Sequence, residues 1–341
     1  MKVAIYGSGA MGTVLGAYLS KKGQDVTLID AYQAHVDALN QNGATIVGED
    51  HFTVPAKAIT PEQMADVYDV VFLFTKQTAN EASLPKLKEF LHEDSVVCTL
   101  QNGVPEYSVE ELIGGNRTIG GTVLWGATFI EPGVSEITQD ISIGNTLFDI
   151  GEINGEITPR TKTVAAILEK MGPVEIMDNL MEARWSKVLI NSCMSGMSAV
   201  TGVTFGEILA DKTAKRLLSY IAAEIIQVAE KAKQKVAPIN GVDTREYGYI
   251  DTAENFERSQ KHFEDFYDDK RTAKASMLQD LEKGKKTEVE MINGFIVDIG
   301  AEHHIPTPFN SKIVELVNEI EAGKRDYSME NTKELTALIQ E

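Results

Sequence analysis

The sequence predicts an α/β fold in which a doubly wound parallel sheet is followed by an all-helical C-terminal domain. In the first half, short apolar runs without a two-residue alternation are separated by helical segments. This pattern is typical of parallel strands that are covered on both faces. After about residue 173 the apolar residues repeat with helical spacing instead. We expect two domains, 1–178 and 179–341, because a chain of 341 residues can form two hydrophobic cores.

The expected elements follow from apolar runs and the turn residues that bound them. The first strand is expected at KVAIYG (2–7) and the first helix at AMGTVLGAYLSKKG (10–23). Later strands are expected at DVTLID (25–30), DVVFLFT (69–75) and SVVCTLQNG (95–103). The pieces GTVLWGATFIEPG (121–133), VSEITQ (134–139) and ISIG (141–144) look like antiparallel additions to the sheet edge.

The C-terminal half is expected to hold long helices at 181–203, 212–235, 273–300 and 309–322. The acidic, aromatic segment 236–271 is interpreted as a surface excursion between helices, with a functional lid as the alternative. The long apolar helices would permit a homodimer.

Charge and composition exclude several classes of function. A net charge of −19 repels nucleic acid and anionic membranes, so neither is an expected partner. Cys98 and Cys193 lie in apolar runs and are expected to be buried and reduced. No segment is long and apolar enough for a secretory signal or a membrane span, so we expect a cytoplasmic protein.

The loop YGSGAMG has the G-x-G-x-x-G spacing of dinucleotide-binding loops, between a predicted strand and a predicted helix. Its first glycine permits a tight turn, its second lets the backbone approach a pyrophosphate, and its third allows close packing of the helix. The helix N-terminus offers free N–H groups and a partial positive charge to phosphates. We therefore expect a Rossmann-type domain whose cofactor-binding loop consists of Gly7, Ser8, Gly9, Ala10, Met11 and Gly12.

Asp30 ends the second predicted strand, twenty-one residues after Gly9. An acidic side chain at this place accepts hydrogen bonds from the ribose hydroxyls of NAD and repels a 2′-phosphate. The next residues, Ala31, Tyr32 and Gln33, supply no cation to bind that phosphate. The residues therefore favour NAD(H) over NADP(H).

The segment ARWSKVLINSCMSG (183–196) places polar residues on a helix that we expect to be buried. No charge follows Lys187 until after residue 206, and Asn191 and Ser195 follow the lysine at four-residue steps. Such spacing puts the three side chains on one helical face. Because an unpaired buried polar group costs roughly 1–3 kcal/mol, either another element or a ligand must supply partners.

Hydride transfer to a carbonyl leaves an alkoxide that needs a proton, so a dehydrogenase needs an acid. No histidine lies in a buried helical pattern, and the adjacent pair before a proline is expected at the surface, so we predict neither a histidine acid nor a metal site. The six histidines are His35, His51, His92, His262, His303 and His304. Lys187 is the better candidate, because desolvation brings a lysine pKa toward the ~7–8 that suits proton donation. The alternative is a lysine that extends to solvent from the end of a helix.

Over nearly its full length the sequence resembles the ketopantoate reductase (2-dehydropantoate 2-reductase) family. The resemblance lies in GSGAMG, LFTKQ, LQNGV, RWSKVLINS, SMLQDLEKGKKTEVEMINGF and IPTPFN, in matching order and spacing. It implies an NAD(P)H-dependent oxidoreductase that reduces a branched 2-oxo acid to a D-2-hydroxy acid. The expected reaction is 2-dehydropantoate to (R)-pantoate, in pantothenate biosynthesis.

The resemblance also implies roles for individual residues. The lysine matching Lys187 is the proton donor, and the glutamate matching Glu288 lies beside the substrate and helps to set that lysine. The residues matching Asn191 and Ser276 hold substrate oxygens. Lys76 and Asn102 would line the cofactor side, near the nicotinamide ribose.

From the residues alone, each of these positions has a simpler interpretation. Glu288 could be exposed to solvent, although the helix expected around it is otherwise apolar and would favour pairing with an ammonium. Ser276 could bond its own backbone at a helix start, Lys76 could be a surface lysine, and Asn102 could form a turn before a glycine.

Two residues depart from the family. A second asparagine commonly stands where this chain has Ser195 and helps to recognise the 4-hydroxyl of ketopantoate; a serine reaches less far. The family typically binds NADPH through a basic residue near the position of Asp30. The resemblance therefore leaves NADP(H) as a possible cofactor. The alternatives are an NAD-dependent D-2-hydroxyacid dehydrogenase acting on other branched or aromatic 2-oxo acids, and a non-catalytic NAD-binding regulator.

Overall fold

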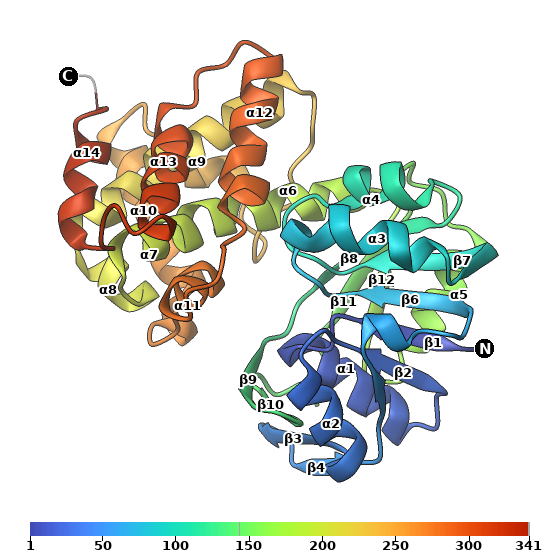
Figure 1. The fold of residues 1–341 in the computed structure, drawn as a ribbon. Coiled ribbons are helices and arrows are strands. Elements are labelled where there is room, and N and C mark those ends of the chain that lie inside the picture. Colours follow the sequence, from blue (N-terminus) through green and yellow to red (C-terminus); the bar gives the residue numbers. More distant parts are fainter. Residues whose placement is uncertain (143, 340–341) are drawn as a thin grey trace. The chain divides into compact units, whose positions relative to one another are not determined.

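The structure is a computed structural model that describes residues 1–142 and 144–339. The chain divides into unit 1, Met1–Leu180, and unit 2, Met181–Glu341. Unit 1 is built on a largely parallel sheet with helices, and unit 2 is helical (Figure 1). The predicted fold class is therefore confirmed.

The main sheet of unit 1 has eight strands in the order β12-β11-β8-β7-β6-β1-β2-β5. All neighbouring pairs are parallel except β11 and β8. In chain order the strands are β1 Val3–Tyr6, β2 Val26–Ile29, β5 Lys57–Ile59, β6 Tyr68–Leu73, β7 Leu91–Thr99, β8 Thr118–Val123, β11 Phe148–Gly151 and β12 Val174–Ile176. Strand β12 lies in a part of the chain where we predicted only helices.

Helices cover both faces of this sheet, which explains the continuous apolar runs of its strands. Along β1, Val3 and Ile5 pack in one core cluster, with residues of α1 and α5, whereas Ala4 and Tyr6 pack in the other, with residues of α3 and α4. The helices of unit 1 are α1 Ala10–Lys21, α2 Gln33–Asn42, α3 Asn80–Lys88, α4 Glu106–Ile113 and α5 Pro159–Leu168.

A second, smaller sheet corrects the prediction that residues 121–151 extend one edge of the main sheet. Strands β9 Ala127–Glu131 and β10 Val134–Ile137 form a hairpin, and β10 pairs with β3 Ala44–Gly48, which pairs with β4 Phe52–Val54. Only β11 joins the main sheet as an antiparallel strand. The predicted piece 141–144 forms no strand at its described residues, and its residue 143 lies outside them.

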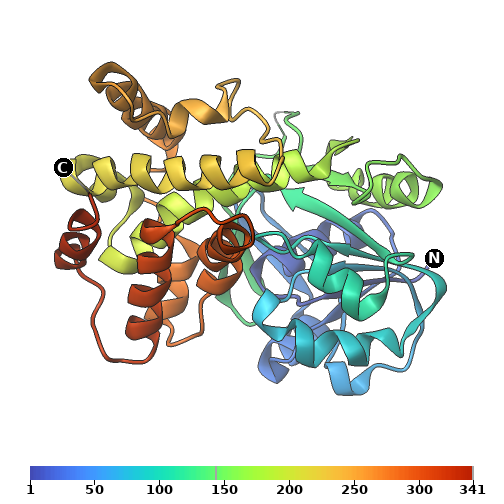
Figure 2. The same ribbon diagram turned by 90° about the horizontal axis from the view of Figure 1, so that it is seen from above.

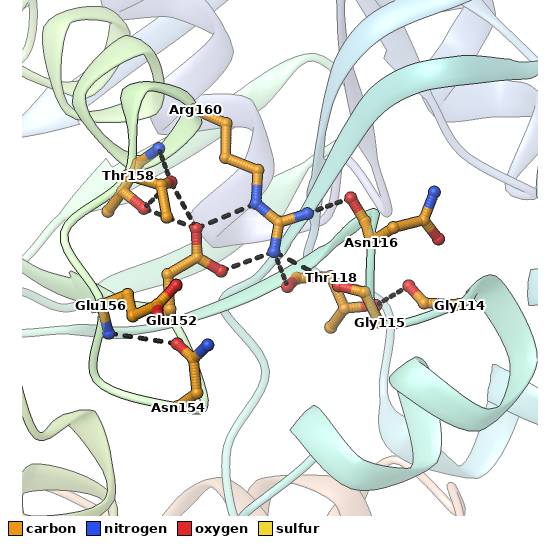
Figure 3. Close-up of polar contacts among 10 residues, drawn as sticks. Gly114, Gly115, Asn116, Thr118, Glu152, Asn154, Glu156, Thr158 and Arg160 are labelled. Atoms are coloured by element: carbon orange, nitrogen blue, oxygen red, sulfur yellow. Dashed lines mark hydrogen bonds and ion pairs between the residues drawn. The ribbon is translucent and has the colours of Figure 1, made fainter.

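A partly buried ion pair ties α5 to the sheet of unit 1 (Figure 3). Arg160 donates to both carboxylate oxygens of Glu152, at 2.9 and 2.5 Å, and its guanidinium also donates to the carbonyls of Gly115, Asn116 and Thr118. Only 5% of the Glu152 side chain is exposed. Burial alone would raise the pKa of Glu152, but hydrogen bonds, chiefly from Arg160, hold it below its ordinary value.

Unit 2 is helical throughout its described elements, with the 20-residue α9 as its long straight member (yellow in Figure 2). The predicted helix 273–300 is interrupted, because α11 ends at Glu282 and Gly284 adopts a left-handed conformation with φ +62°. The helices are α6 Leu180–Ile190, α7 Gly196–Thr201, α8 Phe205–Ala210, α9 Lys212–Lys231, α10 Ala253–Phe266, α11 Ser276–Glu282, α12 Phe295–Glu302, α13 Pro308–Glu321 and α14 Thr332–Thr336.

Two π-helical turns, η3 Asn191–Ser195 and η6 Glu290–Gly294, precede α7 and α12. Such turns are rare and occur frequently at functional sites. The two turns pack against each other, and α11 also contacts η3. The sequence predicted the helical segments but gave no sign of these turns.

The segment 236–271 packs on α9 through α10, which is largely exposed on its other face. Phe263 of α10 is buried, and Ser259 donates to Ser219 of α9 at 2.8 Å. Both cysteines are buried and free, as predicted. In the described part of the chain no helix has the length and apolar character needed to span a membrane.

Candidate active site

The predicted dinucleotide loop connects β1 to α1 and has the required backbone conformation. Gly7 has φ +94°, and a Cβ there would lie 2.5 Å from the backbone nitrogen of Thr75. A Cβ on Gly12 would lie 2.4 Å from the carbonyl oxygen of Gly7. The protein itself therefore requires glycine at these two positions.

Gly9 differs, because a Cβ at this position would meet no protein atom within 4 Å. Gly9 is the N-cap of α1, whose first turn carries no acidic residue and receives no side-chain cap. Such a helix N-terminus offers unsatisfied N–H groups and favours an anion. The open space at Gly9 and the uncapped helix fit a dinucleotide pyrophosphate. Ser8 is buried in this loop, whereas Ala10 and Met11 are half-buried.

Asp30 follows β2 and is half-buried. Its Oδ1 accepts a hydrogen bond from the backbone N–H of Tyr32 at 2.9 Å, which fixes the carboxylate at the end of the strand. Ala31, Tyr32 and Gln33 are exposed. The arrangement fits the predicted contact with a ribose.

Lys76 and Asn102 lie in loops that follow the adjacent strands β6 and β7. The two loops are tied together, since Gln77 donates to the carbonyl of Asn102 at 2.5 Å and Gln101 donates to the carbonyl of Thr75 at 2.7 Å. Lys76 and Asn102 are half-buried at the carboxyl end of the sheet, where the glycine loop also lies. The glutamines were not predicted, although each is the direct neighbour of a predicted residue.

In unit 2 the structure places Lys187 in the third turn of α6, within the range 181–203 that we predicted as a helix. Lys187 lies in the last turn of α6, but the helical path continues through η3 into α7, so this lysine is not at a free helix end. Lys187 and Asn191 are half-buried, and Ser195 is buried. The stretch 188–206 is mostly buried, as predicted.

The π turn improves the alignment of the polar stripe. Four residues advance an α-helix by about 40° beyond one full turn, so two such steps would turn Ser195 about 80° away from Lys187. Asn191 and Ser195 bound the π turn η3, whose hydrogen bonds span five residues. Because a π turn holds more residues than an α turn, four residues in it advance by less than one full turn, which brings Ser195 back toward the face that carries Lys187.

Glu288 lies in the bend before η6, not on a helix as we predicted, and it is only 6% exposed. The alternative of a solvent-exposed carboxylate is therefore wrong. Ser276 is the first residue of α11 and is exposed. Because α11 and η6 both pack against η3, the elements that carry or adjoin Ser276, Glu288 and Asn191 lie together in unit 2.

Comparisons with known proteins identify the family. Residues 3–152 match the family model described as ketopantoate reductase PanE/ApbA, and residues 179–321 match that of the ketopantoate reductase PanE/ApbA C terminal. A 2-dehydropantoate 2-reductase of Pyrococcus horikoshii is 30% identical over 324 residues, which cover 94% of this chain and 98% of the relative. The chain belongs to the ketopantoate reductase family. It is therefore a nicotinamide-dependent oxidoreductase with a small-molecule substrate.

Other relatives agree. A 2-dehydropantoate 2-reductase of Aquifex aeolicus is 28% identical over 93% of this chain and 96% of its own length. The structure of a PanE/ApbA family ketopantoate reductase from Ralstonia eutropha JMP134 superposes with a TM-score of 0.81 at 25% identity, covering 95% of this chain and 99% of that one. D-mandelate dehydrogenase with NADH and anilino(oxo)acetate has the same fold, with a TM-score of 0.80 at 24% identity over 95% and 99% of the chains.

In this ketopantoate reductase family member, a buried polar network holds the two π turns together. Asn293 of η6 donates to the carbonyl of Ser192 in η3 at 3.1 Å and to the side-chain oxygen of Asn310 at 3.0 Å. Glu224 of α9 accepts from the backbone of Phe309 and Asn310, at 2.7 and 3.0 Å, and thus caps α13. Sequence reasoning missed this network, although Asn293 and Asn310 lie in the quoted motifs MINGF and IPTPFN.

The histidines at the C-terminal end of α12 are exposed, whereas one histidine of unit 1 is buried. His303 and His304 are exposed, as predicted. His35, however, is buried in α2 with 1% exposure, so the prediction that no histidine lies in a buried helical pattern is wrong. Gly133, far away in sequence, donates its backbone N–H to Nδ1 of this ring at 3.0 Å, a contact that no local pattern reveals.

Proposed function

We propose that this protein reduces a branched 2-oxo acid to the D-2-hydroxy acid, with 2-dehydropantoate as substrate and (R)-pantoate as product. The observation that carries this proposal is the polar stripe on the buried α6–η3 helix, packed against the elements of Ser276 and Glu288. Family membership over both units supports it.

The residues have distinct proposed tasks. Gly7, Gly9 and Gly12 would hold the cofactor together with Asp30, and Lys76 and Asn102 would lie near its nicotinamide ribose. When bound, the cofactor would supply a hydride to C2 of the 2-oxo acid. Its pyrophosphate would lie at the uncapped N-terminus of α1. The carboxylate of Asp30 favours NADH over NADPH.

Lys187 would act as the general acid. Its ammonium donates a proton to the carbonyl oxygen as the C2–H bond forms, and the neutral amine then regains a proton from solvent. Asn191 and Ser276 hold substrate oxygens, and the Glu288 carboxylate, removed from solvent, favours the charged form of the lysine. Without such an acid the alkoxide would form unneutralised in a buried site, at high cost.

Ser195 supports a second candidate, an NAD-dependent D-2-hydroxyacid dehydrogenase for other branched or aromatic 2-oxo acids. The serine is buried on the substrate stripe and has a shorter reach than the asparagine common in the family. A 4-hydroxyl on the substrate would then lose a hydrogen-bond partner. The structural similarity to D-mandelate dehydrogenase shows that this fold also occurs in an enzyme with that name.

Initial rates separate these candidates. The assay measures kcat/KM with NADH and with NADPH against 2-dehydropantoate, 2-oxoisovalerate and benzoylformate. The proposal predicts the highest value for 2-dehydropantoate with NADH. A higher value for benzoylformate or 2-oxoisovalerate would favour the second candidate, and cofactor binding without turnover on any substrate would indicate a non-catalytic regulator.

A further inference from the structure

His35 contacts the backbone of the dinucleotide loop, although it belongs to the next helix along the chain, α2. Its Nε2 lies 2.7 Å from the carbonyl oxygen of Ser8 and 3.1 Å from the hydroxyl of Thr13. The Thr13 hydroxyl donates to the same carbonyl at 2.6 Å. Because His35, Thr13 and Ser8 are all buried, water does not compete for these hydrogen bonds.

The other ring nitrogen fixes the protonation state of His35. The backbone N–H of Gly133, in the β9–β10 turn, donates to Nδ1 at 3.0 Å. A backbone N–H is only a donor, so Nδ1 must be unprotonated and Nε2 must carry the proton. Burial lowers the pKa of His35 below its ordinary value of 6.5, against the opposing charge of Asp30, so the ring is neutral at pH 7. His35 therefore donates to Ser8 and accepts from Gly133.

This arrangement determines where the next N–H points. In a planar trans peptide the C=O and the N–H point in opposite directions. With the Ser8 carbonyl held toward His35 and Thr13, the N–H of Gly9 points away from them. Gly9 is the N-cap of α1, and a Cβ at this residue would meet no protein atom within 4 Å.

We propose that His35 is a positioning residue for cofactor binding, which holds the Ser8–Gly9 peptide so that the Gly9 N–H faces the pyrophosphate. The inference rests on the proposed dinucleotide function. The β9–β10 turn of the small sheet would then support the glycine loop through the imidazole ring of His35. The ring touches neither substrate nor cofactor in this account.

A matched pair of variants tests the proposal in the full-length protein. The side-chain amide of glutamine reaches the Nε2 position, so His35→Gln keeps the donor to Ser8 and loses the bond to Gly133. The amide of asparagine reaches only the Nδ1 position, so His35→Asn keeps the bond to Gly133 and loses the donor to Ser8. NADH affinity is measured by fluorescence titration, and thermal unfolding reports the folding of each variant.

His35→Asn should weaken NADH binding by roughly tenfold to a hundredfold, as expected for a misdirected hydrogen bond to a charged group. His35→Gln should stay within about threefold of the wild type. In turnover, the KM for NADH should rise in His35→Asn, while kcat at saturating NADH and the KM of the 2-oxo acid stay near wild-type values. Thr13→Val, which removes the second donor to Ser8, should change the KM for NADH in the same direction.

Unchanged NADH affinity in a folded His35→Asn variant would overturn the inference and leave the proposed function intact. Equal losses in both variants, in proportion to their loss of thermal stability, would show a structural role only and also overturn it. If the wild-type chain binds neither NADH nor NADPH in the titration, the proposed function fails and this inference fails with it.

Discussion

Replacing Asp30 with asparagine isolates the charge at the end of β2. The Oδ1 atom of Asp30 accepts from the backbone N–H of Tyr32, and an asparagine oxygen can keep that hydrogen bond. Side-chain size is also preserved, so the loop from β2 to α2 should keep its conformation. Any change in the balance between NADH and NADPH then reports the lost negative charge.

The expected size follows from Coulomb's law. A 2′-phosphate carries a charge of about −1.5 to −2 near neutral pH. At about 5 Å from a carboxylate, repulsion amounts to roughly 1.5 kcal/mol in water-like surroundings and about twice that at half the dielectric constant. Asp30 is half-buried, so the true value lies in this range. The wild type should therefore bind NADH about tenfold to a hundredfold more tightly than NADPH, and Asp30→Asn should remove most of this preference.

Fluorescence titrations with both cofactors at low and high ionic strength provide the assay. Salt should reduce the wild-type preference, because it screens exposed charges, and should have little effect on the ratio in the variant. Asp25→Asn is the matched control, since it removes the same charge from an exposed residue just before the other end of β2. Tighter binding of NADPH by the wild type, or an unchanged ratio in Asp30→Asn, would refute the reasoning.

Three further predictions concern other parts of the molecule. Ser195→Asn should raise kcat/KM for 2-dehydropantoate relative to 2-oxoisovalerate, which lacks the 4-hydroxyl; an unchanged ratio would mean that position 195 does not face that group. Gly9→Ala should leave thermal stability unchanged and weaken NADH binding, whereas Gly12→Ala should lower stability, because only the second Cβ meets protein atoms; similar melting curves for both would contradict this account. Arg160→Met should lower the free energy of unfolding at pH 7 by about 2 kcal/mol, less than for a fully buried pair because Arg160 is 27% exposed. The pKa of Glu152 is lowered in the folded state, so its stabilising contribution is present above the unfolded pKa near 4.5 and is lost as the pH falls through the folded pKa. Urea unfolding at acid pH should therefore show a smaller difference in stability between the wild type and Arg160→Met.

Local patterns predicted the core of unit 1 because the information is contiguous there. The strand β1, the glycine loop, α1 and β2 follow one another within residues 3–29, and each apolar run ends at a glycine or polar residue. The break after α11 also had a local sign, the glycine in LEKGKK, which we did not weigh against the helical periodicity. Gly284 adopts a left-handed backbone conformation there, which is unfavourable for residues other than glycine.

The features that escaped prediction depend on partners far away in sequence. The β9–β10 hairpin joins β3 rather than the main sheet, and His35 accepts a hydrogen bond from Gly133, 98 residues later. Asn293 joins the π turns by reaching Ser192, 101 residues earlier. Hydrophobic periodicity carries no information about such pairings between distant segments. Site residues could therefore be predicted only where they belong to a recognisable local motif.

The most direct test of the proposed mechanism is kcat of Lys187→Ala under conditions where hydride transfer limits turnover, which a primary isotope effect with 4-deuterated NADH establishes. Lys285→Ala, an exposed lysine of the same unit, is the control. A positioned acid contributes about 10²–10⁴-fold, so kcat of Lys187→Ala should fall at least about a hundredfold. NADH affinity should remain near that of the wild type, because the glycine loop belongs to unit 1. Near-normal kcat in Lys187→Ala would contradict the assignment of Lys187 as the acid.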